Sequence, residues 1–230
     1  MKSIVFDTGS LISLTLNDLL WTLEPLKEKY KGSFLIPSRV KYELIDKPLN
    51  SKKYKFEAIR VLTYINKKVI QLVEDEKVKE KALMLLDLAN HTFKTQNTWL
   101  EIVHLAEMEG IACAIEMNSD AFVVDERTCR TLIEDSKSLA NILSHKLHAN
   151  IIIDNDNLKK FLKEVDGVKM IRSVEIAIIA YEAGILDVYL PNIPKPKFNL
   201  LESVLWGVKL NGCAVSEREI KDILSLEFKT

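Results

Sequence analysis

The sequence predicts an α/β fold in which helices cover both faces of a mostly parallel sheet. Short apolar runs bounded by turn residues alternate with longer stretches that have the spacing of amphipathic helices. The apolar runs are nearly continuous, which is typical of strands buried on both faces of a parallel sheet. With 230 residues, of which 47% are hydrophobic, the chain can bury a full core.

The first fifty residues contain a strand followed by a helix, twice. The apolar run 3–6 leads through Asp7 into a helical pattern. A second run, 34–36, meets Pro37, after which apolar residues recur at helical spacing from Val40 onward. Proline is well suited to the first turn of a helix, so this segment again reads as a strand that feeds a helix.

The rest of the chain continues this alternation. Helices are predicted at 56–65, 77–93, 99–117, 126–133, 138–147, 158–165, 174–183 and 200–210, and strands at 69–73, 121–124, 151–153 and 168–171. The run 121–124 is the clearest buried strand and passes through Asp125 directly into a helix. Gly212 ends the penultimate helix, and Ser216 with Glu219 forms a capping box that opens the last one.

Composition excludes several classes of protein. The apolar runs are far shorter than the ~20 residues that span a bilayer, and no signal-peptide pattern follows Met1, so we expect a cytoplasmic protein without a membrane partner. Three cysteines, outside any C-x-x-C pattern, predict neither a disulfide framework nor a cysteine zinc site. A net charge of -1 gives no global attraction to polyanions, so nucleic-acid binding requires a local patch or bound cations.

Four carboxylates are predicted to meet at one edge of the sheet. Ligands of open parallel sheets bind beyond the carboxyl ends of the strands, and Asp7 and Asp125 directly follow two of them. Glu43 lies about two turns into the helix after the second strand. Glu109 lies on the helix that precedes the strand ending at Asp125, so both glutamates can lean over the same crevice.

Such a cluster predicts a divalent metal site. Crowded carboxylates repel one another and stay ionised only when cations neutralise them. Oxygen ligands favour Mg²⁺ or Mn²⁺ over zinc, and these ions can activate a water against a phosphodiester without a covalent nucleophile. The sequence has no glycine-rich phosphate loop, no Ser-His-Asp arrangement and no H-E-x-x-H zinc pattern.

Four stretches, in their order and spacing, resemble the PIN-domain family. They are VFDTGSLI at 5–12, IPSRVKYEL at 36–44, EGIACA at 109–114 and DAFVVDER at 120–127. The resemblance covers residues 2 to about 130, and 172–186 with 200–224 look like the helical end of longer prokaryotic and archaeal PIN-like proteins. It implies a three-layer α/β/α sandwich with extra C-terminal helices. We expect a core at 1–135 with a helical insertion at about 47–98, and a mainly helical extension at 136–230 that completes or decorates the same domain.

The resemblance also implies an activity. Asp7, Glu43, Glu109 and Asp125 match the family's acids, which bind Mg²⁺ or Mn²⁺ in an endoribonuclease that hydrolyses single-stranded RNA and leaves a 5′ phosphate. Thr8 and Ser10 look like the hydroxyls that hold Asp7 or a metal-bound water, and Arg127 is placed to contact phosphate. Partners suggested by the family are RNA, a second copy of the chain, and an antitoxin or RNA-processing protein.

Alternative interpretations remain open at this stage. Asp7 and Asp125 could simply cap helices, Glu43 could be a surface acid, and Glu107 competes with Glu109 for the same role. The alternative function is a catalytically degenerate PIN-like module that binds RNA or protein, and a nuclease acting on DNA is a third possibility. Basic residues between 27 and 60, with three tyrosines among them, form either a phosphate-binding face or an ordinary solvated surface.

Overall fold

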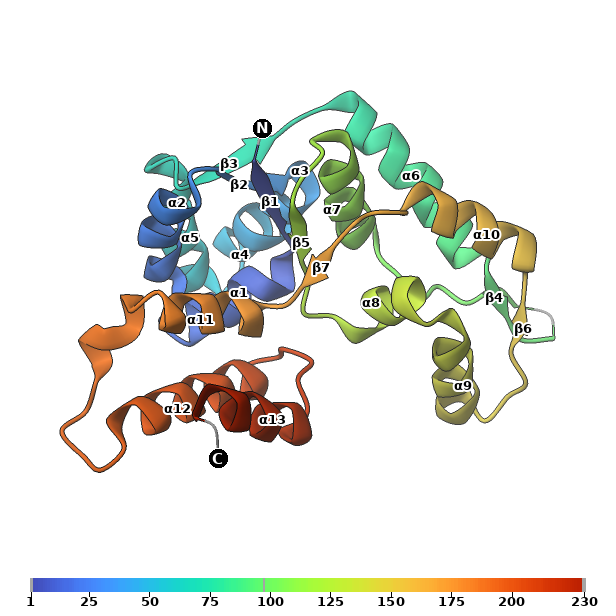
Figure 1. Cartoon of the computed structure of the whole chain (residues 1–230). Helices are drawn as coiled ribbons and strands as arrows, with labels where there is room; N and C mark the ends of the chain where they lie inside the picture. The colour runs from blue at the N-terminus through green and yellow to red at the C-terminus, as the bar shows by residue number, and fades with distance from the viewer. Residues whose placement is uncertain (1, 97, 229–230) are drawn as a thin grey trace.

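The computed structural model describes residues 2–96 and 98–228, and within these ranges a five-stranded parallel sheet forms the centre of the molecule in the order β3-β2-β1-β5-β7 (Figure 1). Its strands are β1 (Ser3–Phe6), β2 (Ser33–Pro37), β3 (Ile70–Val73), β5 (Ala121–Val123) and β7 (Met170–Ile171). The predicted α/β class with a parallel sheet is therefore confirmed.

The central strand shows why the sheet has two buried faces. Val5 of β1 is in register with Leu35 of β2 and with Phe122 of β5, and all three side chains belong to one hydrophobic cluster. The next residue, Phe6, points the opposite way and belongs to the other cluster. Successive side chains of a strand face opposite sides of a sheet, so a continuous apolar run serves both cores at once.

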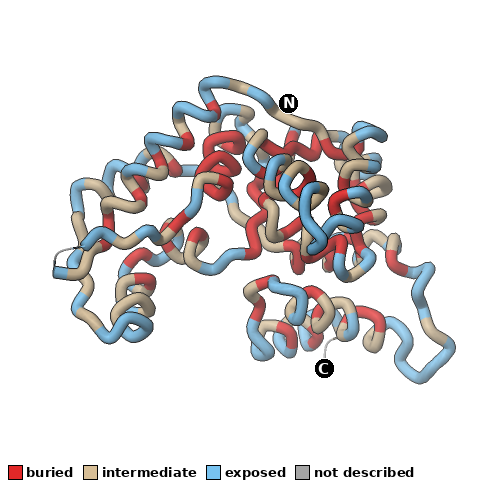
Figure 2. The backbone as a smooth tube through the Cα atoms, turned by 180° about the vertical axis from the view of Figure 1, so that it is seen from behind, coloured by how far each residue is buried: buried red, intermediate tan, exposed pale blue. Residues whose placement is uncertain are grey.

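Helices cover each of these faces and make three layers. One layer contains α1 (Thr8–Leu16), α2 (Leu23–Tyr30), α5 (Lys55–Asn66), α11 (Ser173–Glu182), α12 (Pro196–Leu210) and α13 (Glu217–Phe228). The other contains α6 (Glu76–Asn90), α7 (Leu105–Glu116), α8 (Arg127–Glu134), α9 (Ser136–Leu147) and α10 (Asn155–Glu164). Buried residues are concentrated on the sheet and on the helix sides that face it (Figure 2). The expected α/β/α sandwich is thus observed.

Short elements connect these layers. They are η1 (Leu20–Thr22), α3 (Ser38–Lys41), the π-helical turn η2 (Tyr42–Asp46), α4 (Lys47–Leu49), β4 (Phe93–Lys94), β6 (Ile152–Ile153) and η3 (Ile185–Tyr189). β6 occupies the segment predicted as a strand at 151–153, but it pairs antiparallel with β4 away from the main sheet. In the part of the chain that the structure describes, no helix is long and apolar enough to cross a membrane.

The helix predicted at 99–117 begins later, at Leu105. Its first turn is closed by a glutamate, because the backbone N–H of His104 donates to Glu107 Oε2 at 2.7 Å. Further along, Gly110 lets α7 approach the sheet closely: a Cβ at this position would lie 2.4 Å from Cε2 of Phe122. The tight contact between α7 and β5 therefore depends on glycine.

The C-terminal segment completes the sheet as well as one helical layer. β7 is the edge strand beside β5, with Phe122 in register with Met170. The chain then forms α11, α12 and α13, which lie below the sheet in Figure 1. Gly212, at a φ of 112°, ends α12, and the reciprocal hydrogen bonds between Ser216 and Glu219 open α13 as predicted. All three cysteines are buried free thiols.

Candidate active site

Asp7 is the acid at the centre of the site. It follows β1 and caps α1, accepting a hydrogen bond from the Gly9 backbone N–H at 3.0 Å through Oδ2. Its own backbone N–H donates to the Val123 carbonyl at 2.9 Å, and Ser10 Oγ lies 2.9 Å from the Asp7 carbonyl and 3.1 Å from the Val123 carbonyl. Asp7 is only 5% exposed. The backbone and Ser10 together fix this carboxylate between the two central strands.

The surroundings of Asp7 disfavour its negative charge. Burial is the main cause that raises the pKa of Asp7 to about 6, and the charges of Glu43 and Asp125 add to it, while the N–H groups of Gly9 and Thr8 act in the opposite direction. A carboxylate that is buried beside other acids gains from a cation that offsets the repulsion. Asp7 therefore has the electrostatic character expected of a metal ligand.

Glu43 reaches this site from the π-helical turn η2. Thr8 Oγ1 donates to Glu43 Oε2 at 3.2 Å, and Arg39 Nε lies 3.5 Å from Glu43 Oε1. The Thr8 hydroxyl thus links the first turn of α1 to Glu43, while Ser10 contacts the Asp7 carbonyl and not its carboxylate. Ser10 thus contacts Asp7, as the sequence suggested, and Thr8 contacts Glu43.

Asp125 is held by a residue of the C-terminal segment. The backbone N–H of Ser173 donates to Asp125 Oδ1 at 2.7 Å, and Ser173 Oγ donates to Oδ2 at 2.6 Å. Ser173 is the first residue of α11, so the carboxylate lies at the N-terminus of a helix and is only 3% exposed. Sequence reasoning missed Ser173. The available signal was its place directly after the strand predicted at 168–171, at the same sheet edge as Asp7 and Asp125.

The two acids of α7 point to different neighbours. Glu107 lies beside Asp7, Glu126 and Glu43, and burial together with these charges raises the pKa of Glu107 to about 8. Glu109 instead accepts a hydrogen bond from the Arg39 backbone N–H at 2.5 Å. Burial raises the pKa of Glu109, and the nearby charges of Lys79 and Arg39 lower it. Residues two apart on a helix project about 200° apart, so the two side chains cannot share one role.

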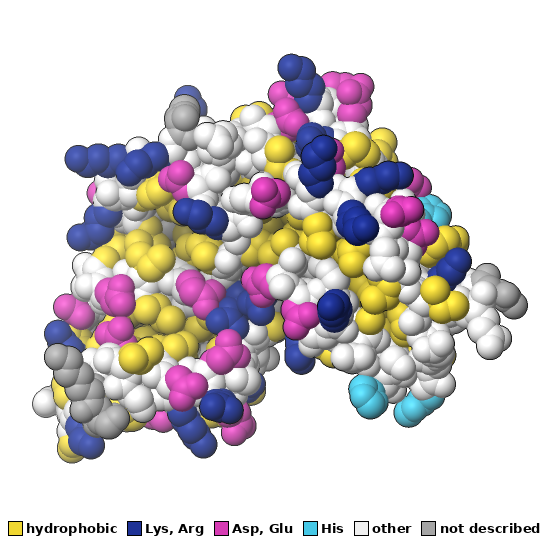
Figure 3. Space-filling view, turned by 45° about the vertical axis from the view of Figure 1, so that its right-hand side comes forward, with side chains coloured by type: hydrophobic (Ala, Val, Ile, Leu, Met, Phe, Trp, Pro, Cys, Tyr) yellow, Lys and Arg dark blue, Asp and Glu magenta, His cyan; other side chains and the backbone are white. Residues whose placement is uncertain are grey.

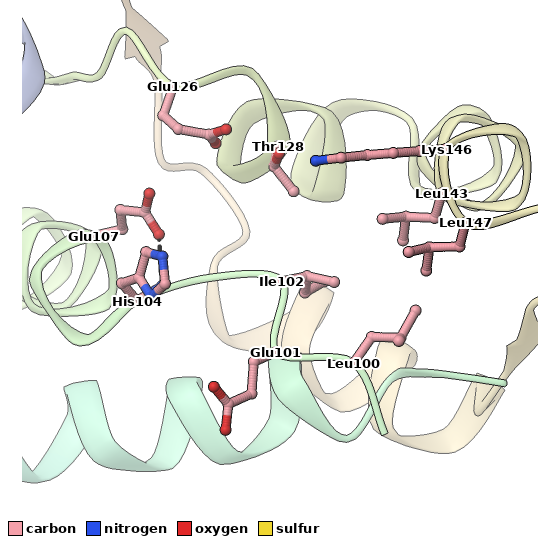
Figure 4. A pocket seen from close by; sticks show the side chains of 10 residues that line it. All are labelled: Leu100, Glu101, Ile102, His104, Glu107, Glu126, Thr128, Leu143, Lys146 and Leu147. Carbon is pink, nitrogen blue, oxygen red and sulfur yellow. Dashed lines mark hydrogen bonds between the residues drawn. The ribbon is translucent and has the colours of Figure 1, made fainter. Parts of the chain in front are cut away.

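A pocket of about 350 Å³ opens next to Glu107. Figure 4 shows the carboxylates of Glu107 and Glu126 on one side of it, with Lys146 and Leu147 of α9 reaching in from the other. Glu126 also caps α8, accepting from the Cys129 backbone N–H at 2.7 Å. Helix α9 lies beyond the four matching stretches, so one of the added elements forms a wall beside the candidate site.

The predicted acids approach one another without forming a closed metal cage. Across residues 2–96 and 98–228, no group of three or more His, Cys, Asp or Glu side chains lies close enough to hold a metal ion. Two of the acids are held by hydrogen bonds: Ser173 donates to both Asp125 oxygens, and the Arg39 backbone N–H donates to Glu109. Each carboxylate oxygen has a second lone pair, so these bonds leave the acids able to bind a cation. The donor set consists of hard oxygens, as Mg²⁺ and Mn²⁺ require.

The model of the family DUF3368, described as a PIN domain, matches residues 3–138. This region contains every acid discussed above and ends before Ser173. Neither the curated proteins nor the solved structures gave a match.

Proposed function

Because this chain belongs to the PIN-domain family, whose members are generally nucleases, we propose that it is a Mg²⁺- or Mn²⁺-dependent endoribonuclease that hydrolyses single-stranded RNA. The observation that supports this proposal most directly is the environment of Asp7. The carboxylate lies at the carboxyl end of the central strand, and burial, with a smaller contribution from the charges of Glu43 and Asp125, raises its pKa to about 6. Burial of an uncompensated acid at a ligand-binding edge is costly, and a divalent cation offsets that cost.

The residues proposed to hold the cation are Asp7, Glu43, Asp125 and one acid of α7. The chemistry that a bound Mg²⁺ or Mn²⁺ supplies is activation of water and charge neutralisation at the phosphodiester. Thr8 orients Glu43 through the 3.2 Å hydrogen bond. Ser173 orients Asp125 through two hydrogen bonds. These contacts hold the acids in place before the substrate arrives, which is how preorganised sites reduce the cost of reaching the transition state.

Helix α7 carries two candidates for the fourth ligand, Glu107 and Glu109. Sequence matching selected Glu109, whose carboxylate accepts the Arg39 N–H. We assign the role to Glu107 because its charge interacts with that of Asp7, whereas Glu109 lies beside Arg39 and Lys79. Both acids interact with the charge of Glu43, and each lines a pocket. Glu109 then has a positioning role: its hydrogen bond with the Arg39 N–H holds the first turn of α3, which continues into the η2 turn that contains Glu43.

Cleavage of end-labelled nucleic acids tests the proposal. Single-stranded RNA, duplex RNA and single-stranded DNA are incubated with Mn²⁺, Mg²⁺ or EDTA and the wild-type chain, Asp7→Asn, Glu107→Gln or Glu109→Gln. We expect metal-dependent cutting of single-stranded RNA that Asp7→Asn and Glu107→Gln abolish. Glu80→Gln, an exposed acid on α6, is the matched control and should cut like the wild type. Equal cutting by Asp7→Asn and wild type would refute the assignment.

The separation of the acids favours a second candidate, a PIN domain that binds RNA or protein without cutting. Its motivating observation is that the described side chains form no ready metal group. Thermal unfolding with and without Mn²⁺ separates the two functions. An intact site should raise the melting temperature with Mn²⁺ and lose this response in Asp7→Asn. RNA binding without cutting and without any Mn²⁺ response would establish the binding module.

A further inference from the structure

A basic pocket lies between α8 and the two last helices. It has a volume of about 800 Å³, and its cationic residues are Arg127 and Arg130 of α8 and Lys209 of α12. The chain has a net charge of only -1, and Figure 3 shows basic and acidic side chains interleaved over the face in view. A local group of cations therefore decides where a polyanion can be held.

The hydrogen bonding of these cations leaves donors available. Arg130 Nε is buried, and within the described part of the chain it has no hydrogen-bond partner. Arg127 is exposed at the first turn of α8, and neither arginine forms an ion pair among residues 2–96 and 98–228. Lys209 Nζ donates to the Val215 carbonyl at 2.7 Å, which fixes its charge at the pocket wall. A buried guanidinium donor without an acceptor is a site that an anion can satisfy.

Among the described residues that line the pocket, the one acid, Glu219, forms an ion pair with an arginine outside the pocket. Glu219 lies 2.7 Å from Arg172 Nη1. The Ser216 backbone N–H and the Arg172 side chain lower the pKa of Glu219 to about 2, against the effect of burial. Arg172 also pairs with Glu175 at 2.6 Å, so two carboxylates share this arginine. The positive balance of the pocket therefore comes from its own lining, in which three cations face one carboxylate, and this balance suits a phosphate.

The pocket shares a wall with the candidate active site. The backbone N–H of Ala214, which lines the pocket, donates to the Asp125 carbonyl at 3.3 Å, and Arg127 follows Asp125 by two residues. We propose that this pocket binds a backbone phosphate of single-stranded RNA that flanks the bond to be cut. The proposal rests on the proposed nuclease function, and it assigns part of the RNA contact to the C-terminal helices.

Binding under non-cleaving conditions tests this pocket. The anisotropy of a fluorescent single-stranded RNA is titrated in EDTA over a series of KCl concentrations, with wild type, Arg127→Gln, Arg130→Gln and the double variant. The logarithm of the association constant falls linearly with the logarithm of the salt concentration. For single strands, each lost phosphate contact reduces the magnitude of this negative slope by about 0.7. Because the pocket is proposed to hold one phosphate, we expect the double variant to lose about 0.7 in slope and to bind several-fold more weakly. Melting temperatures verify that each variant is folded.

The control is Arg218→Gln, which removes an arginine that is 91% exposed on α13 and paired with Asp222 at 3.9 Å. It should keep the wild-type slope. A double variant with the wild-type slope and affinity would overturn the pocket assignment, even if the wild type cuts RNA. If the double variant binds RNA more weakly but the wild type does not cut RNA in the separate assay with Mn²⁺ or Mg²⁺, the pocket is supported and the nuclease function is refuted. The binding titration therefore tests the phosphate pocket, and the cleavage assay separately tests the nuclease function.

Discussion

Replacing Glu107 by glutamine should change how the stability of the metal-free protein depends on pH. The folded chain keeps the Glu107 proton up to a pH of about 8, whereas the ordinary pKa of glutamate is 4.5. Between these values the folded state binds more protons than the unfolded state, so the free energy of unfolding falls as the pH rises. Each pKa unit corresponds to about 1.4 kcal/mol, so the loss between pH 4.5 and 8 amounts to up to about 5 kcal/mol.

Glutamine keeps the size of the side chain and an oxygen that accepts from the His104 N–H, but it cannot ionise. We therefore expect Glu107→Gln to be the more stable protein at pH 8 and close to the wild type at pH 5. Urea unfolding at several pH values in EDTA measures this difference, with Glu80→Gln as the control. If wild type and Glu107→Gln lose the same stability between pH 5 and 8, the burial and charge environment described for Glu107 is wrong.

Three further predictions concern the same region. Mn²⁺ should raise the melting temperature of the wild type more at pH 8 than at pH 5, because protons compete for Asp7, whose pKa is about 6, and Asp7→Asn should lose this response. Ser173→Ala removes the hydroxyl that donates to Asp125 at 2.6 Å; we expect a cost of about 1 to 3 kcal/mol by urea unfolding and slower RNA cleavage at unchanged RNA affinity. Gly110→Ala places a methyl group 2.4 Å from the Phe122 ring and should destabilise by about 1 to 3 kcal/mol, and a wild-type urea midpoint would contradict the tight contact.

The strand ends were readable from the sequence because apolar runs stop abruptly there. Asp7 and Asp125 each follow such a run, and the structure places both at the carboxyl edge of the sheet. Their approach to each other follows from parallel pairing of β1 with β5, which the alternation of strands and helices predicts. Local patterns were sufficient for these two positions.

The acids of α7 could not be assigned in the same way. Every residue from Ala106 to Ala114 is buried, so this helix has no polar face from which its rotation could be read. The choice between Glu107 and Glu109 depends on which neighbours surround each side of the helix. Those neighbours come from α3, η2 and α6, and from the residues that precede α1 and α8. Ser173 was missed for a related reason: it is 48 residues away from Asp125 along the chain, and no local pattern connects the two.

Because β7 is an edge strand that comes late in the sequence, the sheet stays incomplete until most of the chain has been synthesised. Residues 3–138 emerge from the ribosome well before Ser173 and the strand that precedes it. Until then, the outer edge of β5 has no strand beside it, and the Asp125 carboxylate has neither of its donors from Ser173. A nascent or proteolytically shortened chain can thus contain the whole family match and still lack the edge strand and both Ser173 hydrogen bonds to Asp125. Segments that lie outside the matched region therefore complete the surroundings of Asp125 only after that region has been synthesised.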